Sequence, residues 1–265
     1  MTLELFCASG SLCSQKVKLV LAEKNLEWKS RLINLLAFEN LQPSYMRLNP
    51  RGVVPTLIHN GQVITDSVMI IRYLDEQFPH PRLIPTEPML REKMDGWIYL
   101  QNQFPMRELM YGNYQGIEGI VLRRSVQIKE KLIPKLMQAN PDLKEQYTSK
   151  LKDIKHWNCT IQNANEIANL NTRIVPMLEI LETQLSKTNW LCGASYSLVD
   201  TIWTAVLNRL NELKFGYLWE NNTRPALSLY FNQLRARPSF ITAIQDDKMP
   251  LPMLLAGLGR VFLGI

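Results

Sequence analysis

The chain has 265 residues, of which 46% are hydrophobic and 20% are charged, and its formal net charge is +6. This length is enough for two domains with substantial apolar cores, and the composition excludes a disordered chain. The 30 basic and 24 acidic residues are spread along the sequence. We therefore predict no nucleic-acid binding, although a positive field favours anionic ligands.

The chain opens with a short apolar strand, residues 3–6, followed by a helix predicted to run to Lys24. Ser11 and Cys13 lie at the N-terminus of this helix. Unpaired backbone N–H groups and the helix dipole stabilise anions there, so a bound thiolate, or Cys13 itself, would ionise more easily. Serine is also a common N-cap residue, and the sequence leaves both roles open for Ser11.

A proline-led hairpin is predicted next. Val54-Pro55 leads into a strand over residues 56–59, and Asn60-Gly61 connects it to a second strand over residues 62–65. Asn-Gly between alternating apolar residues is a strong hairpin signal. Because proline cannot donate to a sheet ladder, we expect Pro55 at the start or edge of its strand, with the backbone of Val54 free to pair with a ligand.

The helix after the hairpin opens with Asp66-Ser67, and either residue can cap it. The order strand, helix, strand, helix, hairpin and helix is typical of a thioredoxin-like α/β domain. The predicted apolar face of this last helix comprises Ile70, Ile71, Leu74 and Phe78.

A proline-rich linker and a helical region follow. We predict a thioredoxin-like domain over residues 1–83, a linker over 84–90 and an all-α domain over 91–265. Ser197 and Asp200 fit a capping box, for which we expect a structural role. The predicted helices span residues 90–107, 120–139, 143–157, 165–186, 198–214 and 227–235.

Basic residues are densest at Arg123-Arg124 and over residues 129–135, where apolar residues recur at helical spacing. We predict this stretch to be the solvated face of a packed helix. The tail, residues 249–265, is almost wholly apolar apart from Arg260, but it is shorter than a standard membrane span. We expect a flap over a ligand pocket or a dimer contact, and membrane attachment is the alternative.

The four cysteines, Cys7, Cys13, Cys159 and Cys192, lack C-x-x-C or metal-ligand spacing, so we predict neither a disulfide framework nor a metal site. The chain opens without the basic and apolar stretches of a secretory signal peptide. We therefore expect a reducing, cytoplasmic location.

These motifs together resemble the cytosolic glutathione S-transferases. Ser11-x-Cys13-Ser14-x-Lys16-Val17 is similar to the zeta-class signature. The resemblance implies an α/β thioredoxin-like N-terminal domain and an all-α C-terminal domain. Family membership alone does not fix the activity, because the matching segments are similar both to tetrachlorohydroquinone reductive dehalogenases and to ganglioside-induced differentiation-associated proteins. Those segments are residues 37–41, 45–49, 53–57, 111–112, 157–159, 194–197 and 224–240.

The resemblance also implies glutathione as co-substrate, a homodimer and a set of binding residues. Ser11 matches the serine that activates the glutathione thiol. Asp66 would bind the ammonium of the γ-glutamyl end, and Ser67 its carboxylate. Val54 would pair with the cysteinyl backbone, beside a cis peptide bond at Pro55.

Two positions leave the choice of subclass open. Zeta-class enzymes carry Lys-Gln before Val-Pro where this chain has Gly52-Val53, so Arg51 is our candidate for the glycyl end. In the dehalogenases, the cysteine matching Cys13 takes glutathione from a conjugated intermediate as a mixed disulfide. Zeta-class isomerases keep a cysteine there without that step, so Cys13 is either chemically active or site-lining. Cys7 is expected to be buried and inert.

We expect the acceptor pocket between the domains, near the helices that carry Tyr111 and Trp203, although such a tryptophan is often a core residue. Aromatic side chains there suit a flat electrophile. The sequence thus predicts a glutathione transferase for an aromatic or quinone-like small molecule, acting by conjugation or reductive dehalogenation. The alternatives are a zeta-like maleylacetoacetate isomerase and a non-catalytic, glutathione-binding, membrane-associated adaptor.

Overall fold

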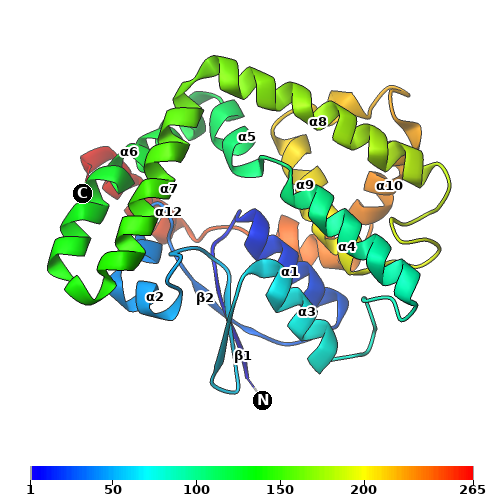
Figure 1. Ribbon diagram of the computed structural model, residues 1–265, viewed down its shortest axis with the longest axis horizontal. Helices are drawn as coiled ribbons and strands as arrows, with labels where there is room; N and C mark the ends of the chain where they lie inside the picture. Colours follow the sequence, from blue (N-terminus) through cyan, green and yellow to red (C-terminus); the bar gives the residue numbers. More distant parts are fainter. Residues whose placement is uncertain (1, 265) are drawn as a thin grey trace.

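The N-terminal part is built on a four-stranded sheet in the order β2-β1-β3-β4. The computed structural model describes residues 2–264 (Figure 1). β1 is parallel to β2 and antiparallel to β3, which forms the predicted hairpin with β4. The strands are β1 (Leu3–Cys7), β2 (Lys29–Leu32), β3 (Thr56–His59) and β4 (Gln62–Thr65). The thioredoxin-like arrangement expected from the sequence is confirmed.

Helices α1 (Leu12–Glu23) and α3 (Ser67–Gln77) pack side by side against this sheet, and α1 also packs against the helical part of the chain. The C-terminal end of α1 is fixed by Lys24, whose buried ammonium lies 2.6 Å from a carboxylate oxygen of Asp75. Asp75 also accepts hydrogen bonds from the N–H groups of Leu83 and Ile84. The start of the interdomain connection is therefore held against α3. The remaining short helices of this part are η1 (Glu39–Leu41) and α2 (Pro43–Leu48).

The helical part begins with α4 (Pro88–Asn102), inside the predicted linker. The single helix predicted over residues 90–107 is wrong, because α4 ends and α5 (Met106–Asn113) begins just after Pro105. Proline lacks an N–H donor and restricts the residue before it, so the helix breaks there. The other elements are α6 (Gly116–Ala139), η2 (Pro141–Leu143), α7 (Lys144–Gln162), α8 (Ala164–Leu185), α9 (Leu198–Glu212), η3 (Phe215–Leu218) and α10 (Pro225–Arg235).

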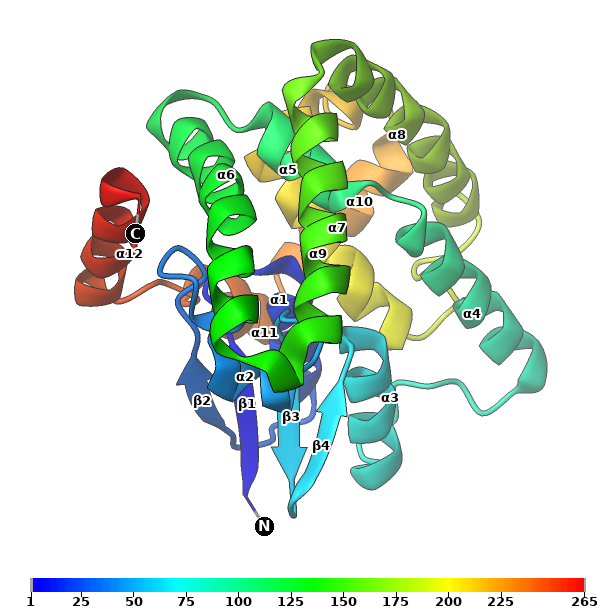
Figure 2. The same ribbon diagram turned by 60° about the vertical axis from the view of Figure 1, so that its left-hand side comes forward.

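Helices α6 and α7 form an antiparallel hairpin that extends toward the N-terminal part, above α2 (Figure 2). The Tyr147 hydroxyl donates a hydrogen bond of 2.8 Å to the Leu41 carbonyl, and Arg47 on α2 pairs with Asp142. These contacts hold the tip of the α6–α7 hairpin against the N-terminal part.

After α10 the chain returns to the N-terminal part. α11 (Pro238–Phe240) and η4 (Ile241–Gln245) pack against α1, and the tail forms α12 (Leu251–Leu263). Asn34 donates to the Met253 carbonyl, and Arg124 on α6 donates to the Val261 carbonyl. Across residues 2–264, no helix combines the length and the apolar character that a membrane crossing requires. The flap, dimer and membrane roles of the tail remain predictions.

The capping box of α9 has the structural role that was predicted. Asp200 is fully buried, and its carboxylate accepts hydrogen bonds from the Ser197 N–H and hydroxyl, the Leu191 N–H and the Tyr230 hydroxyl. These four donors come from three separate segments, so one carboxylate joins the start of α9 to α10 and to the preceding loop.

Asp200→Ala should lower the free energy of unfolding by about 3 kcal/mol or more, because several buried donors lose their acceptor. The exposed Asp246→Ala, as control, should change it by less than about 0.5 kcal/mol. Chemical denaturation followed by circular dichroism measures both values. Equal stability of the two variants would contradict the structural role of Asp200.

Candidate active site

Ser11 is the N-cap of α1, and its hydroxyl oxygen accepts a hydrogen bond of 3.4 Å from the Ser14 N–H. Its hydroxyl hydrogen has no acceptor among residues 2–264, and the N–H groups of Leu12 and Cys13 have none there either. A capping role and a donor role are therefore compatible. An anion at this helix start would meet the hydroxyl, free N–H groups and the positive end of the dipole.

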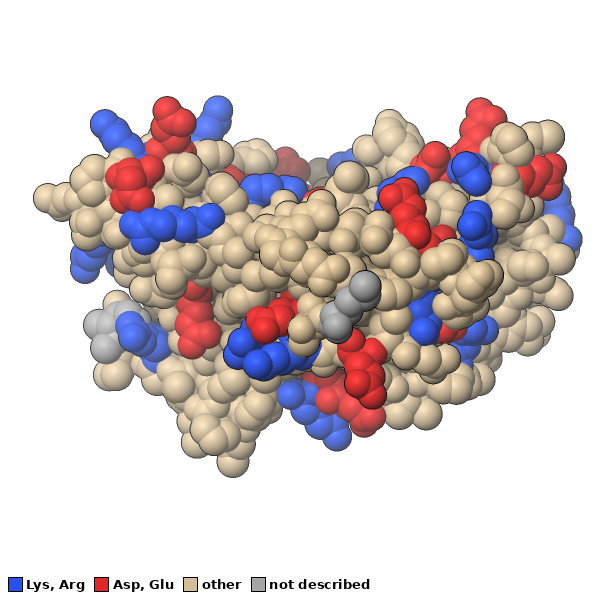
Figure 3. Space-filling model, turned by 90° about the horizontal axis from the view of Figure 1, so that it is seen from below, with Lys and Arg blue, Asp and Glu red and all other residues tan. Residues whose placement is uncertain are grey.

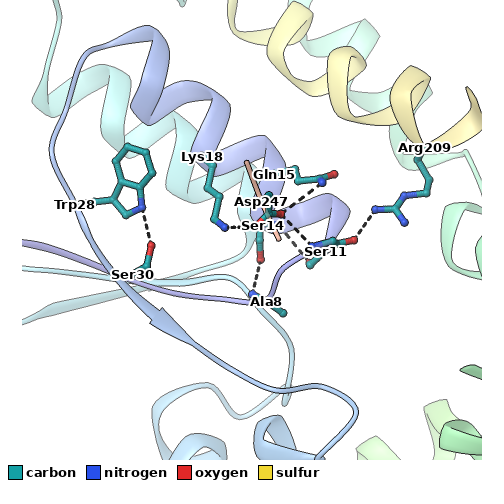
Figure 4. Close-up of polar contacts among 10 residues, drawn as sticks. Ala8, Ser11, Ser14, Gln15, Lys18, Trp28, Ser30, Arg209 and Asp247 are labelled. Atoms are coloured by element: carbon teal, nitrogen blue, oxygen red, sulfur yellow. Dashed lines mark hydrogen bonds and ion pairs between the residues drawn. The ribbon is translucent and has the colours of Figure 1, made fainter. Parts of the chain in front are cut away.

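The loop before Ser11 is held from the other side by the helical part of the chain (Figure 4). The Gly10 N–H donates to Asp247 at 3.0 Å, and the Gly10 carbonyl accepts from the Arg209 guanidinium. Asp247 also lies 2.5 Å from the Lys18 ammonium, and Arg209 donates to the Tyr114 hydroxyl at 2.9 Å. Both groups fix the backbone that leads into α1.

Cys13 is a partly exposed free thiol in the first turn of α1, whereas Cys7 is fully buried, as expected. Burial raises the pKa of the Cys7 thiol. Lys16, one turn further along α1, is 3% exposed, and its ammonium donates to the Gln101 side chain at 2.6 Å. Burial lowers the pKa of Lys16, while the nearby Cys13 and Asp66 act in the opposite direction. The Lys16 ammonium thus interacts with the Cys13 thiol through its charge, while its hydrogen bond is made to Gln101.

The second group of predicted residues lies between β3 and α3. The Val54–Pro55 peptide is cis, as the resemblance implied, and the backbone N–H and C=O of Val54 make no hydrogen bond within residues 2–264. Asp66 is the N-cap of α3, with a φ of +72°, and its carboxylate accepts from the N–H groups of Val68 and Met69. A non-glycine residue in this region of φ is strained and favours a functional explanation.

Ser67 is the first residue of α3 and is 7% exposed. Neither its N–H nor its hydroxyl has a partner within the described part of the chain. Arg51 lies 3.5 Å from the Asp66 carboxylate, so the guanidinium sits beside the predicted γ-glutamyl site. The geometry gives an acidic group, a free hydroxyl and one free N–H at one helix start, a set that fits a ligand bearing both an ammonium and a carboxylate.

The two aromatic residues predicted at the acceptor pocket lie in different surroundings. Trp203 has no exposed surface and packs edge-on against Trp97 and Phe104, so it is a core residue of the helical part. Tyr111, on α5, packs edge-on against Trp157 with ring centroids 4.4 Å apart. Burial raises the pKa of Tyr111 to about 12, which keeps its hydroxyl neutral. We therefore leave Trp203 out of the proposed site.

Sequence reasoning missed the groups that hold this site in place. Lys16 was part of a quoted motif without an assigned role. Gly10, Arg209 and Asp247 carried no local signal, because their hydrogen bonds join residues 199 and 237 positions apart. On the face seen in Figure 3, basic and acidic side chains are interspersed.

Comparison with known proteins identifies the family. Residues 10–77 match the N-terminal domain of glutathione S-transferases, and residues 111–238 match their C-terminal domain. LigF from Sphingobium sp. strain SYK-6 is 30% identical over 254 residues, covering 94% of this chain and 95% of that protein. The chain belongs to the glutathione S-transferase family. Glutathione is the co-substrate of this family.

Further relatives of this transferase fall in branches with different names. The tetrachloro-p-hydroquinone reductive dehalogenase of Sphingobium chlorophenolicum is 28% identical and covers 90% of this chain and 94% of its own length. The human ganglioside-induced differentiation-associated protein 1-like 1 is 26% identical, and the match covers 92% of this chain and 74% of that protein. The crystal structure of the β-etherase LigF superposes with a TM-score of 0.73, covering 92% of this chain and 98% of that one, at 25% identity.

Asp66→Asn should weaken glutathione binding by about 1–3 kcal/mol, because the ligand ammonium loses its charged partner while the helix cap is kept. Ser67→Ala should have an effect of the same size through the γ-glutamyl carboxylate. Calorimetric titration with glutathione measures both, and Glu220→Gln, on the exposed surface, serves as control. Wild-type affinity in both site variants would remove these residues from the glutathione site.

Proposed function

We propose that this transferase activates glutathione at the start of α1 and transfers it to an aromatic or quinone-like electrophile. The observation that carries the proposal is the Ser11 hydroxyl. It accepts from the Ser14 N–H and keeps its own hydrogen free at a helix N-terminus with two further unpaired N–H groups. A hydroxyl that donates to a thiolate stabilises the charged form and lowers the pKa of the bound thiol.

We further propose that halogenated acceptors are reduced through Cys13. In the first step the glutathione thiolate attacks the ring carbon, the C–S bond forms and halide leaves. The Cys13 thiolate then attacks the glutathione sulfur, so that an S–S bond forms and the C–S bond breaks. The ring keeps the electron pair and takes up a proton. A second glutathione thiolate releases oxidised glutathione and restores Cys13, so two thiols supply the two electrons.

The accessibility of Cys13 and the nearby Lys16 ammonium support this second step, since disulfide exchange requires a thiolate within reach of the bound sulfur. The name of the dehalogenase relative supports the same class of acceptor. A homodimer in a reducing, cytoplasmic setting is part of the proposal. The setting must be reducing because Cys13 must be reduced at the start of each cycle.

Ser11→Ala should shift the pH profile of kcat/KM to higher pH and slow conjugation, because the bound thiol loses its hydrogen-bond donor. Glutathione affinity should change little. Ser11→Thr keeps the hydroxyl and should restore most of the rate. Steady-state assays with an activated aryl halide across pH 5.5–8.5 measure these values, and a wild-type profile for Ser11→Ala would leave Ser11 as a cap alone.

Cys13→Ser cannot form a disulfide, so this variant should add glutathione to a halogenated hydroquinone but fail to release the reduced product. The conjugate should accumulate, as measured by mass spectrometry, and the wild type should carry glutathionylated Cys13. Cys159→Ser, which changes an exposed cysteine, should behave as wild type. Undiminished reduction by Cys13→Ser would leave Cys13 as a site-lining residue, and a wild type that forms no reduced product would favour the isomerase or plain-transferase alternatives. Glutathione binding without turnover would favour the adaptor.

A further inference from the structure

A cluster of basic side chains lies where α5, α6 and α7 meet. Lys129 is buried, whereas Arg107 and Lys150 are half-buried. Two of the three lie against the Trp157 ring. The Arg107 guanidinium carbon lies 4.7 Å from the ring centroid, and the Lys129 ammonium lies 5.6 Å from it. Lys150 precedes Trp157 on α7, and its charge lowers the pKa of Lys129. We call Arg107, Lys129 and Lys150 the basic cluster.

Lys129 is the unusual member of the basic cluster. It is 6% exposed, and its ammonium makes no hydrogen bond or ion pair with any residue that the structure describes. The solvated role predicted for this stretch is wrong for Lys129, although Lys131 and Lys135 on the same helix are exposed. Lys129 has no counter-charge among these residues, so its ammonium is available to pair with an anion that a ligand supplies.

The acidic groups near the basic cluster are already used. The Arg107 guanidinium pairs with Asp153 and with Glu108, each at 3.0 Å. Burial and the charges of Lys150 and Arg107 lower the pKa of Lys129 to about 7. Burial lowers the pKa of Lys150 to about 8. Lys129 therefore lacks the stabilisation that a paired anion would give, whereas the charge of Asp153 partly offsets the effect of burial on the pKa of Lys150.

The basic cluster lies close to the proposed acceptor side of the site. Tyr111 lies on the same short helix as Arg107 and packs edge-on against Trp157, the ring that Arg107 and Lys129 contact. The charge of Arg51, beside Asp66, acts on Lys150. The α6–α7 hairpin itself extends toward the N-terminal part (Figure 2). Tyr111 thus joins the basic cluster to the helix near which the acceptor pocket is predicted.

We propose that the basic cluster binds a carboxylate on the aromatic acceptor, with Lys129 as its principal partner. This inference rests on the proposed transfer of glutathione to an aromatic electrophile, and it adds that the acceptor is anionic. A carboxylate would pair with the unsatisfied Lys129 ammonium, and the remaining groups of the basic cluster would add charge around it.

The charge on Lys129 makes this binding dependent on pH. Lys129 must be protonated to pair with the carboxylate, so affinity should fall as pH rises above about 7, the pKa that burial gives this residue. Binding should also raise the pKa of Lys129 and take up a proton near neutral pH. The other ionisable groups around Lys129 are Arg107 and Glu108 on α5, Glu130 on α6, and Lys150 and Asp153 on α7.

Calorimetric titration with 4-chloro-3-nitrobenzoate and its neutral analogue 4-chloro-3-nitrobenzamide tests the proposal on the full chain. The wild type should bind the carboxylate at least tenfold more tightly than the amide at pH 6.5. Lys129→Met, which keeps the length and removes the charge, should bind both probes equally. Lys131→Met, an exposed lysine on the same helix, should keep the wild-type preference.

Lys129→Arg provides a second variant that does not depend on the folding of Lys129→Met. It should keep the preference for the carboxylate and lose the decline in affinity above pH 7, because arginine stays protonated. An equal affinity of the wild type for both probes, or an undiminished preference in Lys129→Met, would overturn the proposal.

Glutathione-dependent turnover of the two probes separates this inference from the proposed function. Tight carboxylate binding without conjugation of either probe would support the anion site and contradict the transferase reaction. Conjugation of both probes with equal kcat/KM and equal affinity would support the transferase reaction and overturn the anion site.

Discussion

The active-site geometry depends on one residue, Gly10, whose backbone N–H and C=O are both hydrogen-bonded by residues from the helical part of the chain. Its N–H donates to Asp247 and its carbonyl accepts from Arg209. Asp247 is also paired with Lys18 within α1. The start of α1 therefore reaches its position only when the helical part has folded against the sheet. The position of Ser11 therefore depends on the packing of the helical part against the N-terminal part.

The same region offers free hydrogen-bond donors to the thiol position, and the acidic Asp247 beside it is already paired with Lys18. The N–H groups of Leu12 and Cys13 are free at the start of α1, while Asp66 caps the neighbouring helix and Ser67 is its first residue. Such an arrangement stabilises a thiolate at one end of a ligand and a zwitterionic group at the other. The strained φ of Asp66 is consistent with a position kept for binding rather than for folding.

Local signals predicted the parts of the site that local structure builds. Ser11 at a helix start, the proline-led strand at Val54-Pro55 and the Asp66 cap all depend on neighbours within a few residues, and each lies in the predicted element. Arg209 and Asp247 act across the whole chain, so periodicity could not identify them. The helix break at Pro105 could have been predicted from the sequence, because proline disfavours the helix interior, but a single helix was predicted there. Lys129 was assigned to solvent because helical spacing alone cannot show what a neighbouring helix covers.

The measurement that tests this account most directly is a crystal structure of the protein with glutathione bound. The account predicts the glutathione sulfur within about 3.5 Å of the Ser11 hydroxyl oxygen. It also predicts the γ-glutamyl group on Asp66 and Ser67, and the cysteinyl backbone paired with Val54. Glutathione bound elsewhere, or with its sulfur pointing away from the start of α1, would contradict the account.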